Sequence, residues 1–104
     1  MTFGLSENTI SKIQNVFLQF PEIDEAILYG SRAKGNFKTG SDIDISLRGD
    51  GLNLELLAKV SAQLDDLSIP YQIDLSIFSE IKNTDLLNHI HRVGKVFFAK
   101  ALTQ

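Results

Sequence analysis

Apolar side chains recur every three or four positions in three segments of the chain, and this spacing predicts helices. The three segments are residues 6–20, 53–67 and 85–93. Ser6 and Asn53 are suitable N-caps for the first two helices, and Thr84 is the expected N-cap of the third. Gly94 is expected to end the third helix, because glycine commonly follows the last helical turn.

Four shorter segments have the residue pattern of β-strands. They are residues 25–29, 42–47, 71–78 and 95–100. The second is the clearest, since Asp42, Asp44 and Ser46 alternate there with apolar residues. A brief helix is expected at residues 31–35. Strands that alternate with helices predict an α/β fold, with a parallel crossover between the second and third strands. The pattern leaves the relative direction of the first two strands open.

Length and charge restrict the classes of protein to which the chain can belong. Its 104 residues favour a single domain over 1–104. A formal net charge of −3 argues against broad nucleic-acid binding, which needs a basic surface. The chain has no cysteine, which excludes disulfides and thiolate metal sites. No signal peptide and no apolar run long enough to span a bilayer are present, so a cytoplasmic location without membrane contact is expected.

The stretch from Gly30 to Leu47 carries the strongest chemical signal. Strand residues two apart share a face, with Cα atoms about 6.7 Å apart, so the carboxylates of Asp42 and Asp44 can converge on a metal. Asp74 lies on the polar face of the third expected strand and would add another carboxylate. Such oxygen ligands suit Mg²⁺ or Mn²⁺. A solvated strand face is the plainer interpretation, but the flanking isoleucines and the lack of a lysine partner favour the metal.

The loop after the first expected strand suits phosphate. Gly30 and Ser31 would present backbone N–H groups and a hydroxyl at the start of the brief helix. Arg32 and Lys34 would supply charge, although Lys34 fits a solvated surface cation equally well. With Ser41 at the end of the loop, these residues form the predicted nucleotide-binding set. The loop has neither Walker A spacing nor a Rossmann fingerprint.

Other candidate residues carry weaker signals. His89 and His91 are two apart on a helix, so they point to roughly opposite sides and are interpreted as surface or interface residues. Ser31 as a hydrolase nucleophile lacks both the Gly-x-Ser-x-Gly context and an evident histidine base. Tyr29 and Tyr71 are interpreted as packing residues.

The pair Gly30-Ser31, ten further residues and then Asp42-x-Asp44 resembles the Gly-Ser-x10-Asp-x-Asp signature of the DNA polymerase β-like nucleotidyltransferase superfamily. The segments Gly-Ser-Arg-Ala-Lys-Gly and Ser-Asp-Ile-Asp-Ile resemble its minimal nucleotidyltransferase (MNT) branch, whose antitoxin-type members are paired with HEPN-domain proteins. The resemblance covers nearly all of the chain. It implies a nucleotidyltransferase fold, with a small mixed β-sheet and helices packed on one face.

By this resemblance, Gly30 and Ser31 would bind the terminal phosphates of ATP or another nucleoside triphosphate. Asp42 and Asp44 would hold two Mg²⁺ ions, and Asp74 would complete the site and help to deprotonate the acceptor hydroxyl. The chain would be an antitoxin that transfers AMP to a tyrosine of a HEPN toxin while pyrophosphate leaves. Larger relatives carry an extra domain, so a partner subunit or a homodimer is expected to complete the site.

Two alternatives remain beside this hypothesis. The chain would be a catalytically silent antitoxin if it neutralised its partner by contact alone. It would be a small-molecule nucleotidyltransferase of the antibiotic-modifying type if it acted on a soluble acceptor, which the lack of an acceptor-binding domain disfavours.

Overall fold

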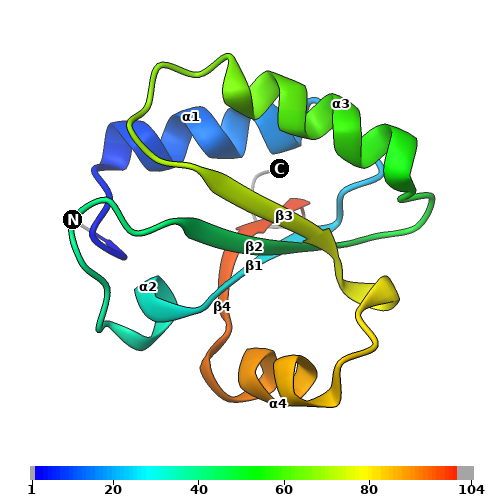
Figure 1. The fold of residues 1–104 in the computed structure, drawn as a ribbon. Coiled ribbons are helices and arrows are strands. Elements are labelled where there is room, and N and C mark those ends of the chain that lie inside the picture. The colour runs from blue at the N-terminus through cyan, green and yellow to red at the C-terminus, as the bar shows by residue number, and fades with distance from the viewer. Residues whose placement is uncertain (1, 101–104) are drawn as a thin grey trace.

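A four-stranded β-sheet forms the centre of the molecule in the computed structural model, which describes residues 2–100 (Figure 1). The strand order is β3-β2-β1-β4. The strands are β1 (Glu25–Tyr29), β2 (Ile43–Arg48), β3 (Ile73–Ile77) and β4 (Lys95–Ala99). β2 runs antiparallel to β1 and parallel to β3, while β4 pairs antiparallel with the other edge of β1. The predicted α/β class, mixed sheet and parallel crossover are confirmed. The relative direction of the first two strands, which the sequence left undetermined, is antiparallel.

Two long helices, α1 (Glu7–Leu18) and α3 (Leu54–Asp65), lie together over one face of the sheet (Figure 1). The two long helices are thus packed on one face, as predicted. α4 (Thr84–Val93) lies on the opposite side of the sheet from them, and α2 (Ser31–Lys34) is a single turn after β1. A short 3₁₀ turn, Phe78–Glu80, follows β3.

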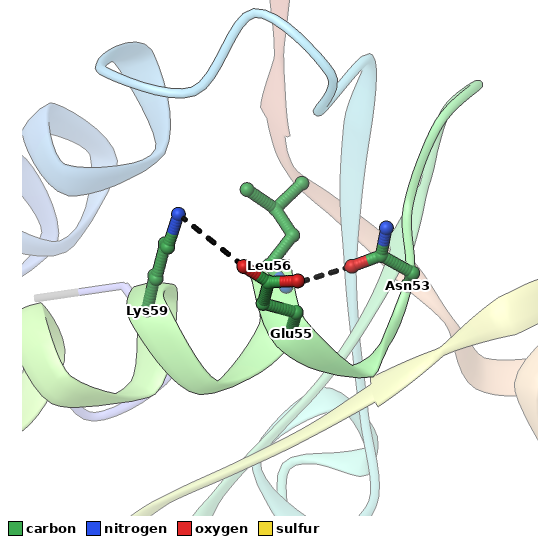
Figure 2. Close-up of polar contacts among 4 residues, drawn as sticks. All are labelled: Asn53, Glu55, Leu56 and Lys59. Atoms are coloured by element: carbon green, nitrogen blue, oxygen red, sulfur yellow. Dashed lines mark hydrogen bonds and ion pairs between the residues drawn. The ribbon is translucent and has the colours of Figure 1, made fainter.

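The predicted caps of the two long helices are confirmed. The Ser6 side chain accepts a hydrogen bond from the Thr9 amide at the start of α1. At the start of α3, Asn53 accepts from the Leu56 amide at 2.8 Å (Figure 2). One turn into the same helix, Lys59 lies 3.9 Å from Glu55, an exposed pair that contributes little to stability (Figure 2).

The predicted cap of the last helix was wrong by one residue. The Asn83 side chain accepts from the Asp85 and Leu86 amides, so Asn83 and not Thr84 is the N-cap of α4. The backbone explains the difference, since Asn83 is extended and Thr84 is already helical. Gly94 follows the last helical residue as predicted.

The core lies between the sheet and the two long helices. Leu28, Ile43 and Ile45 point from the central strands to this side and are fully buried with Phe17 of α1 and Val60 of α3. The acidic residues that alternate with the isoleucines of β2 therefore point to the other face. Within residues 2–100, no helix is long and apolar enough to cross a membrane.

Candidate functional site

Strand register places three polar side chains in one row across the sheet. Tyr29 of β1 is the antiparallel partner of Asp44, and Asp44 is in turn the parallel partner of Asp74 on β3. Neighbouring strands are about 4.8 Å apart, and partners in register point to the same face. The crossover through α3 thus brings Asp74 beside Asp44, although thirty residues separate them in sequence. Asp42 precedes β2, whose first residue is Ile43, and its side chain is exposed.

Within residues 2–100, the three aspartates form an acidic group without a lysine or arginine ion-pair partner. Burial raises the pKa of the Asp44 carboxyl above its ordinary value, the charges of Asp74 and Asp42 raise it further, and His89 opposes the rise. Among residues 2–100, no Lys or Arg lies within ion-pair distance of these three carboxylates. Close carboxylates without a cationic partner repel one another, and a bound cation would relieve this repulsion.

The three aspartates do not enclose an ion without other ligands. In the described part of the chain, no three His, Cys, Asp or Glu side chains are close enough together to hold one. Asp74 is exposed on the edge strand, and Asp42 is exposed before β2. Their chemistry nevertheless suits Mg²⁺, which usually keeps several waters and takes only one or two carboxylates together with substrate phosphates.

Gly30 lies against the carboxylate of Asp44 at the point where β1 turns into α2. It is the N-cap of α2 and has φ 77° and ψ −157°, a conformation that is almost confined to glycine. A Cβ atom added to Gly30 would lie 2.3 Å from Oδ2 of Asp44. The predicted phosphate loop and the predicted metal ligand are therefore in direct contact, and only glycine permits that approach.

Arg32 lies in the protein interior, which differs from the predicted direct contact with nucleotide. Its side chain is 2% exposed. The guanidinium donates to the backbone oxygen of Ser41 from Nε and Nη2, at 3.1 and 2.8 Å, and to that of Phe3 from Nη1 at 2.9 Å. It also stacks near the rings of Phe37 and Tyr71, at 5.1 and 4.8 Å from their centroids. These contacts make Arg32 an internal support of the loop.

The remaining members of the predicted nucleotide-binding set are distributed along the loop. Ser31 is the first residue of α2 and is half-buried, while Lys34 is exposed at the end of that helix. The Ser41 hydroxyl accepts a hydrogen bond from the Lys38 amide at 2.9 Å, and its backbone oxygen is the one that Arg32 contacts. Ser41 therefore closes the loop, and Lys34 is the cation of this set that is exposed to solvent.

His89, interpreted from the sequence as a surface or interface residue, is part of the site. Its Nε2 atom accepts a hydrogen bond from the Gly30 amide at 3.0 Å. Its ring meets that of Tyr29 edge to face, with centroids 6.1 Å apart. His91 is exposed as expected and lies edge to face with Phe78. The polarity of the faces of α4 is the sequence signal that distinguishes the two histidines. It identifies the more buried side, which carries His89, but not Gly30 as the hydrogen-bond partner.

A second group missed by sequence reasoning lies beside the aspartates on the same face. Ser46 is fully buried and accepts a hydrogen bond from the Ser76 hydroxyl at 3.0 Å. Burial raises the pKa of the Tyr29 phenol above its ordinary value, and a hydrogen bond with Ser76 lowers it in part. The negative charges of Asp44 and Asp74 raise this pKa further. The phenol therefore stays neutral beside the carboxylates. Tyr29 is half-buried and lies beside Asp44 in the strand register.

Solved structures with the same fold include several toxin–antitoxin complexes. A chain of a toxin–antitoxin structure with AMP-PNP is 23% identical, with 95% of this chain and 77% of that chain covered and a TM-score of 0.68. A chain of the MntA–HepT toxin–antitoxin structure is 18% identical over 94% of this chain and 76% of that one, with a TM-score of 0.67. A chain from a tri-AMPylated Shewanella oneidensis HEPN toxin in complex with an MNT antitoxin is 21% identical over 95% and 76%, with a TM-score of 0.60.

Sequence comparison identifies the family directly. No curated protein sequence matches the chain. Residues 11–102 match the family model described as "Polymerase beta, Nucleotidyltransferase". This match spans the Gly30–Ser31 loop, all three aspartates and every strand of the sheet. The chain therefore belongs to the polymerase β nucleotidyltransferase family.

Proposed function

We propose that this chain is a Mg²⁺-dependent nucleotidyltransferase that transfers AMP from ATP to a hydroxyl on a HEPN-type partner, and that it acts as the antitoxin of that partner. The family match supports nucleotidyl transfer in general. Similar structures include one with AMP-PNP and one with an AMPylated HEPN toxin, which support the choice of nucleotide and acceptor. The single observation that carries the proposal is the contact of Gly30 with Asp44, in register with Asp74.

Each residue of the site has a proposed role. Asp42, Asp44 and Asp74 would ligate Mg²⁺, as two ions, with Mn²⁺ as a substitute. The metal would neutralise phosphate charge and stabilise the leaving pyrophosphate. Gly30 and Ser31 would contact the terminal phosphates from the start of α2, and Lys34 would add a charge from solvent. Arg32 and Ser41 would shape the loop without contacting the nucleotide, because each is already bonded within it.

The exposed position of Asp74 explains how another protein could supply the acceptor. β3 is an edge strand, and Asp74 points away from the core with an exposed side chain. In the proposed reaction the acceptor hydroxyl attacks the α-phosphorus of ATP, the bond to the pyrophosphate breaks, and Asp74 takes the hydroxyl proton. The partner would complete the acceptor side, as a hetero-oligomer, and the cytoplasm is the proposed compartment.

Transfer of label from ATP tests this function. The chain is incubated with Mg²⁺, ATP labelled at the α-phosphate and the HEPN-type partner, and label on the partner is measured. Asp42→Asn and Asp44→Asn are expected to lower transfer about 100-fold or more, because they remove charge that binds the metal. Asp65→Asn is the matched control, since Asp65 is exposed in α3 on the other side of the sheet. Unchanged transfer in both site variants contradicts the proposal.

The alternative, a silent antitoxin that works by binding alone, predicts a different result. Inhibition of the partner would then need no ATP and would survive Asp44→Asn. An inhibition assay with and without ATP separates the two functions, because the proposed enzyme loses inhibition when ATP is omitted.

A further inference from the structure

His89 connects α4 to the loop that follows β1 through a hydrogen bond. The Gly30 amide donates to Nε2 of His89 at 3.0 Å, across 59 residues of sequence. Because Nε2 is the acceptor in this bond, the ring presents a lone pair to the Gly30 N–H group. The His89 ring also packs edge to face with that of Tyr29. One backbone donor is thus held by one side-chain acceptor.

The Gly30 backbone needs such support, because α2 is too short to fix it. α2 has a single turn, closed by bonds from the Lys34 amide to the Gly30 oxygen and from the Gly35 amide to the Ser31 oxygen. These bonds hold the turn together but do not hold it against the sheet. As a glycine, Gly30 also has a backbone that is the least restricted by its own sterics. Its position beside Asp44 therefore depends on contacts from outside the helix.

In the described part of the chain, side-chain hydrogen bonds of Arg32 and His89 provide such contacts. Arg32 anchors the loop to Ser41 and to the N-terminal segment at Phe3. His89 anchors Gly30 from the side of α4. The Arg32 contacts set the course of the loop beyond α2, whereas the His89 contact sets the residue that touches the Asp44 carboxylate.

We propose that His89 is a positioning residue of the nucleotidyl-transfer site, which holds Gly30 against Asp44 by accepting the hydrogen bond of its amide. The consequence for catalysis rests on the proposed function. The consequence for the loop does not, because the hydrogen bond and the close approach are properties of the free chain. His89 acts through Gly30 and does not itself contact the nucleotide.

The inference requires a hydrogen-bond acceptor at the position of His89 Nε2. Substitutions at residue 89 can distinguish the loss of this acceptor from a loss of side-chain packing. In His89→Gln the amide oxygen can occupy the region of Nε2 and accept from Gly30. In His89→Leu the volume is retained approximately but the acceptor is lost. His91→Leu is the matched control, because His91 is two residues away on the same helix, exposed and without contact to Gly30.

The first measurement is made on the free protein by NMR. A ¹⁵N–¹⁵N scalar coupling between the Gly30 amide and Nε2 of His89 is expected in the wild type. Exchange of the Gly30 amide with solvent should become about five- to tenfold faster in His89→Leu, which corresponds to the loss of one hydrogen bond. It should stay near the wild-type rate in His89→Gln and His91→Leu. Equal exchange in the wild type and His89→Leu overturns the inference, whatever the activity.

The second measurement is the kcat/KM for ATP in label transfer to the partner. We expect a decrease of about tenfold in His89→Leu, recovery in His89→Gln and no change in His91→Leu. An active wild type with an equally active His89→Leu variant also overturns the inference. A third outcome separates the two proposals. If the wild type transfers no label, but its Gly30 coupling is observed and disappears in His89→Leu, the proposed function fails and the support of the loop by His89 stands.

Discussion

Substitution of Gly30 by alanine tests the contact between the loop and the carboxylate most directly. At φ 77° and ψ −157°, Gly30 has a backbone conformation that L-residues adopt only with strain. The new methyl group would also lie 2.3 Å from Oδ2 of Asp44, far inside normal contact distance. Gly30→Ala therefore combines two separate costs, one in the backbone and one in the Asp44 side chain.

The size of each cost follows from the geometry. Backbone strain in this region costs about 1–3 kcal/mol. The Asp44 carboxylate must turn away, and an off-rotamer side chain costs about 0.5–1.5 kcal/mol. Alanine also restricts the unfolded chain, which returns about 0.4–1 kcal/mol. The free energy of unfolding should thus fall by about 0.5–4 kcal/mol in Gly30→Ala, with Tm lowered by roughly 4 °C or more per kcal/mol.

Urea unfolding followed by circular dichroism measures this change, and Gly35→Ala provides the control. Gly35 has φ 88° and ψ 4°, but no atom lies within 4 Å of a Cβ added there. Gly35→Ala should lower the free energy of unfolding by about 1 kcal/mol or less, because left-handed strain is partly offset by the restricted unfolded chain. The excess loss in Gly30→Ala combines the contact with Asp44 and the different backbone strain at the two glycines.

A double-mutant cycle identifies the source of that excess. In Asp44→Ala the nearest remaining atom, Cβ of residue 44, lies 3.6 Å from the added methyl group, which is an ordinary contact. Gly30→Ala should therefore be less destabilising on the Asp44→Ala background by about 0.5–1.5 kcal/mol. Equal losses on both backgrounds, or equal losses in Gly30→Ala and Gly35→Ala, would refute the reasoning.

Three further predictions concern single side chains. Burial and like charges raise the pKa of Asp44 in the folded protein. Between the ordinary and the raised pKa, the folded state therefore binds more protons than the unfolded state. The stability of the wild type falls as pH rises through that window. Asp44→Asn should remove this dependence in a urea titration against pH. It should raise stability at pH 7 by less than about 1 kcal/mol, because water screens this half-exposed carboxyl, and an unchanged pH profile contradicts the reasoning. Arg32→Lys should lower stability by about 2–4 kcal/mol in thermal unfolding, because an ammonium cannot replace a buried planar group that bonds two carbonyls; near-normal stability would contradict this role. Asn83→Ala should cost about 1 kcal/mol and Thr84→Ala less than 0.5 kcal/mol, and the reverse order would disprove the cap assignment.

Local patterns predicted most of the fold. The strand β1 (Glu25–Tyr29) has the predicted bounds, because an apolar run that ends in Gly30 has a clear stop. The predicted β2 began one residue early, at Asp42. The alternation of polar and apolar residues starts at Asp42, whereas strand pairing begins only at Ile43. Asn83 and Thr84 are both good capping residues, so composition could not choose between them, and backbone conformation decided.

The pairing of Asp44 with Asp74 illustrates what topology adds to a pattern. Alternation placed both residues on polar faces, and the length of the intervening helix predicted a parallel crossover. Register was not fixed by either argument, and a slip of one residue would have turned one carboxylate into the core. The observed register pairs the two aspartates and also Ser46 with Ser76, whose hydroxyls bond.

Arg32 and His89 show why the loop could not be derived completely from its own sequence. An arginine beside a glycine-rich loop suits a phosphate ligand, and only the fold shows its donors bonded to Phe3 and Ser41. A histidine on the last helix carries no local sign that it accepts from an amide 59 residues earlier. Each contact joins segments that are brought together by packing of the sheet and the helices. A motif therefore identifies the groups that contact a ligand more readily than the groups that hold them in place. In this loop, Arg32 and His89 hold the backbone around Gly30 through hydrogen bonds.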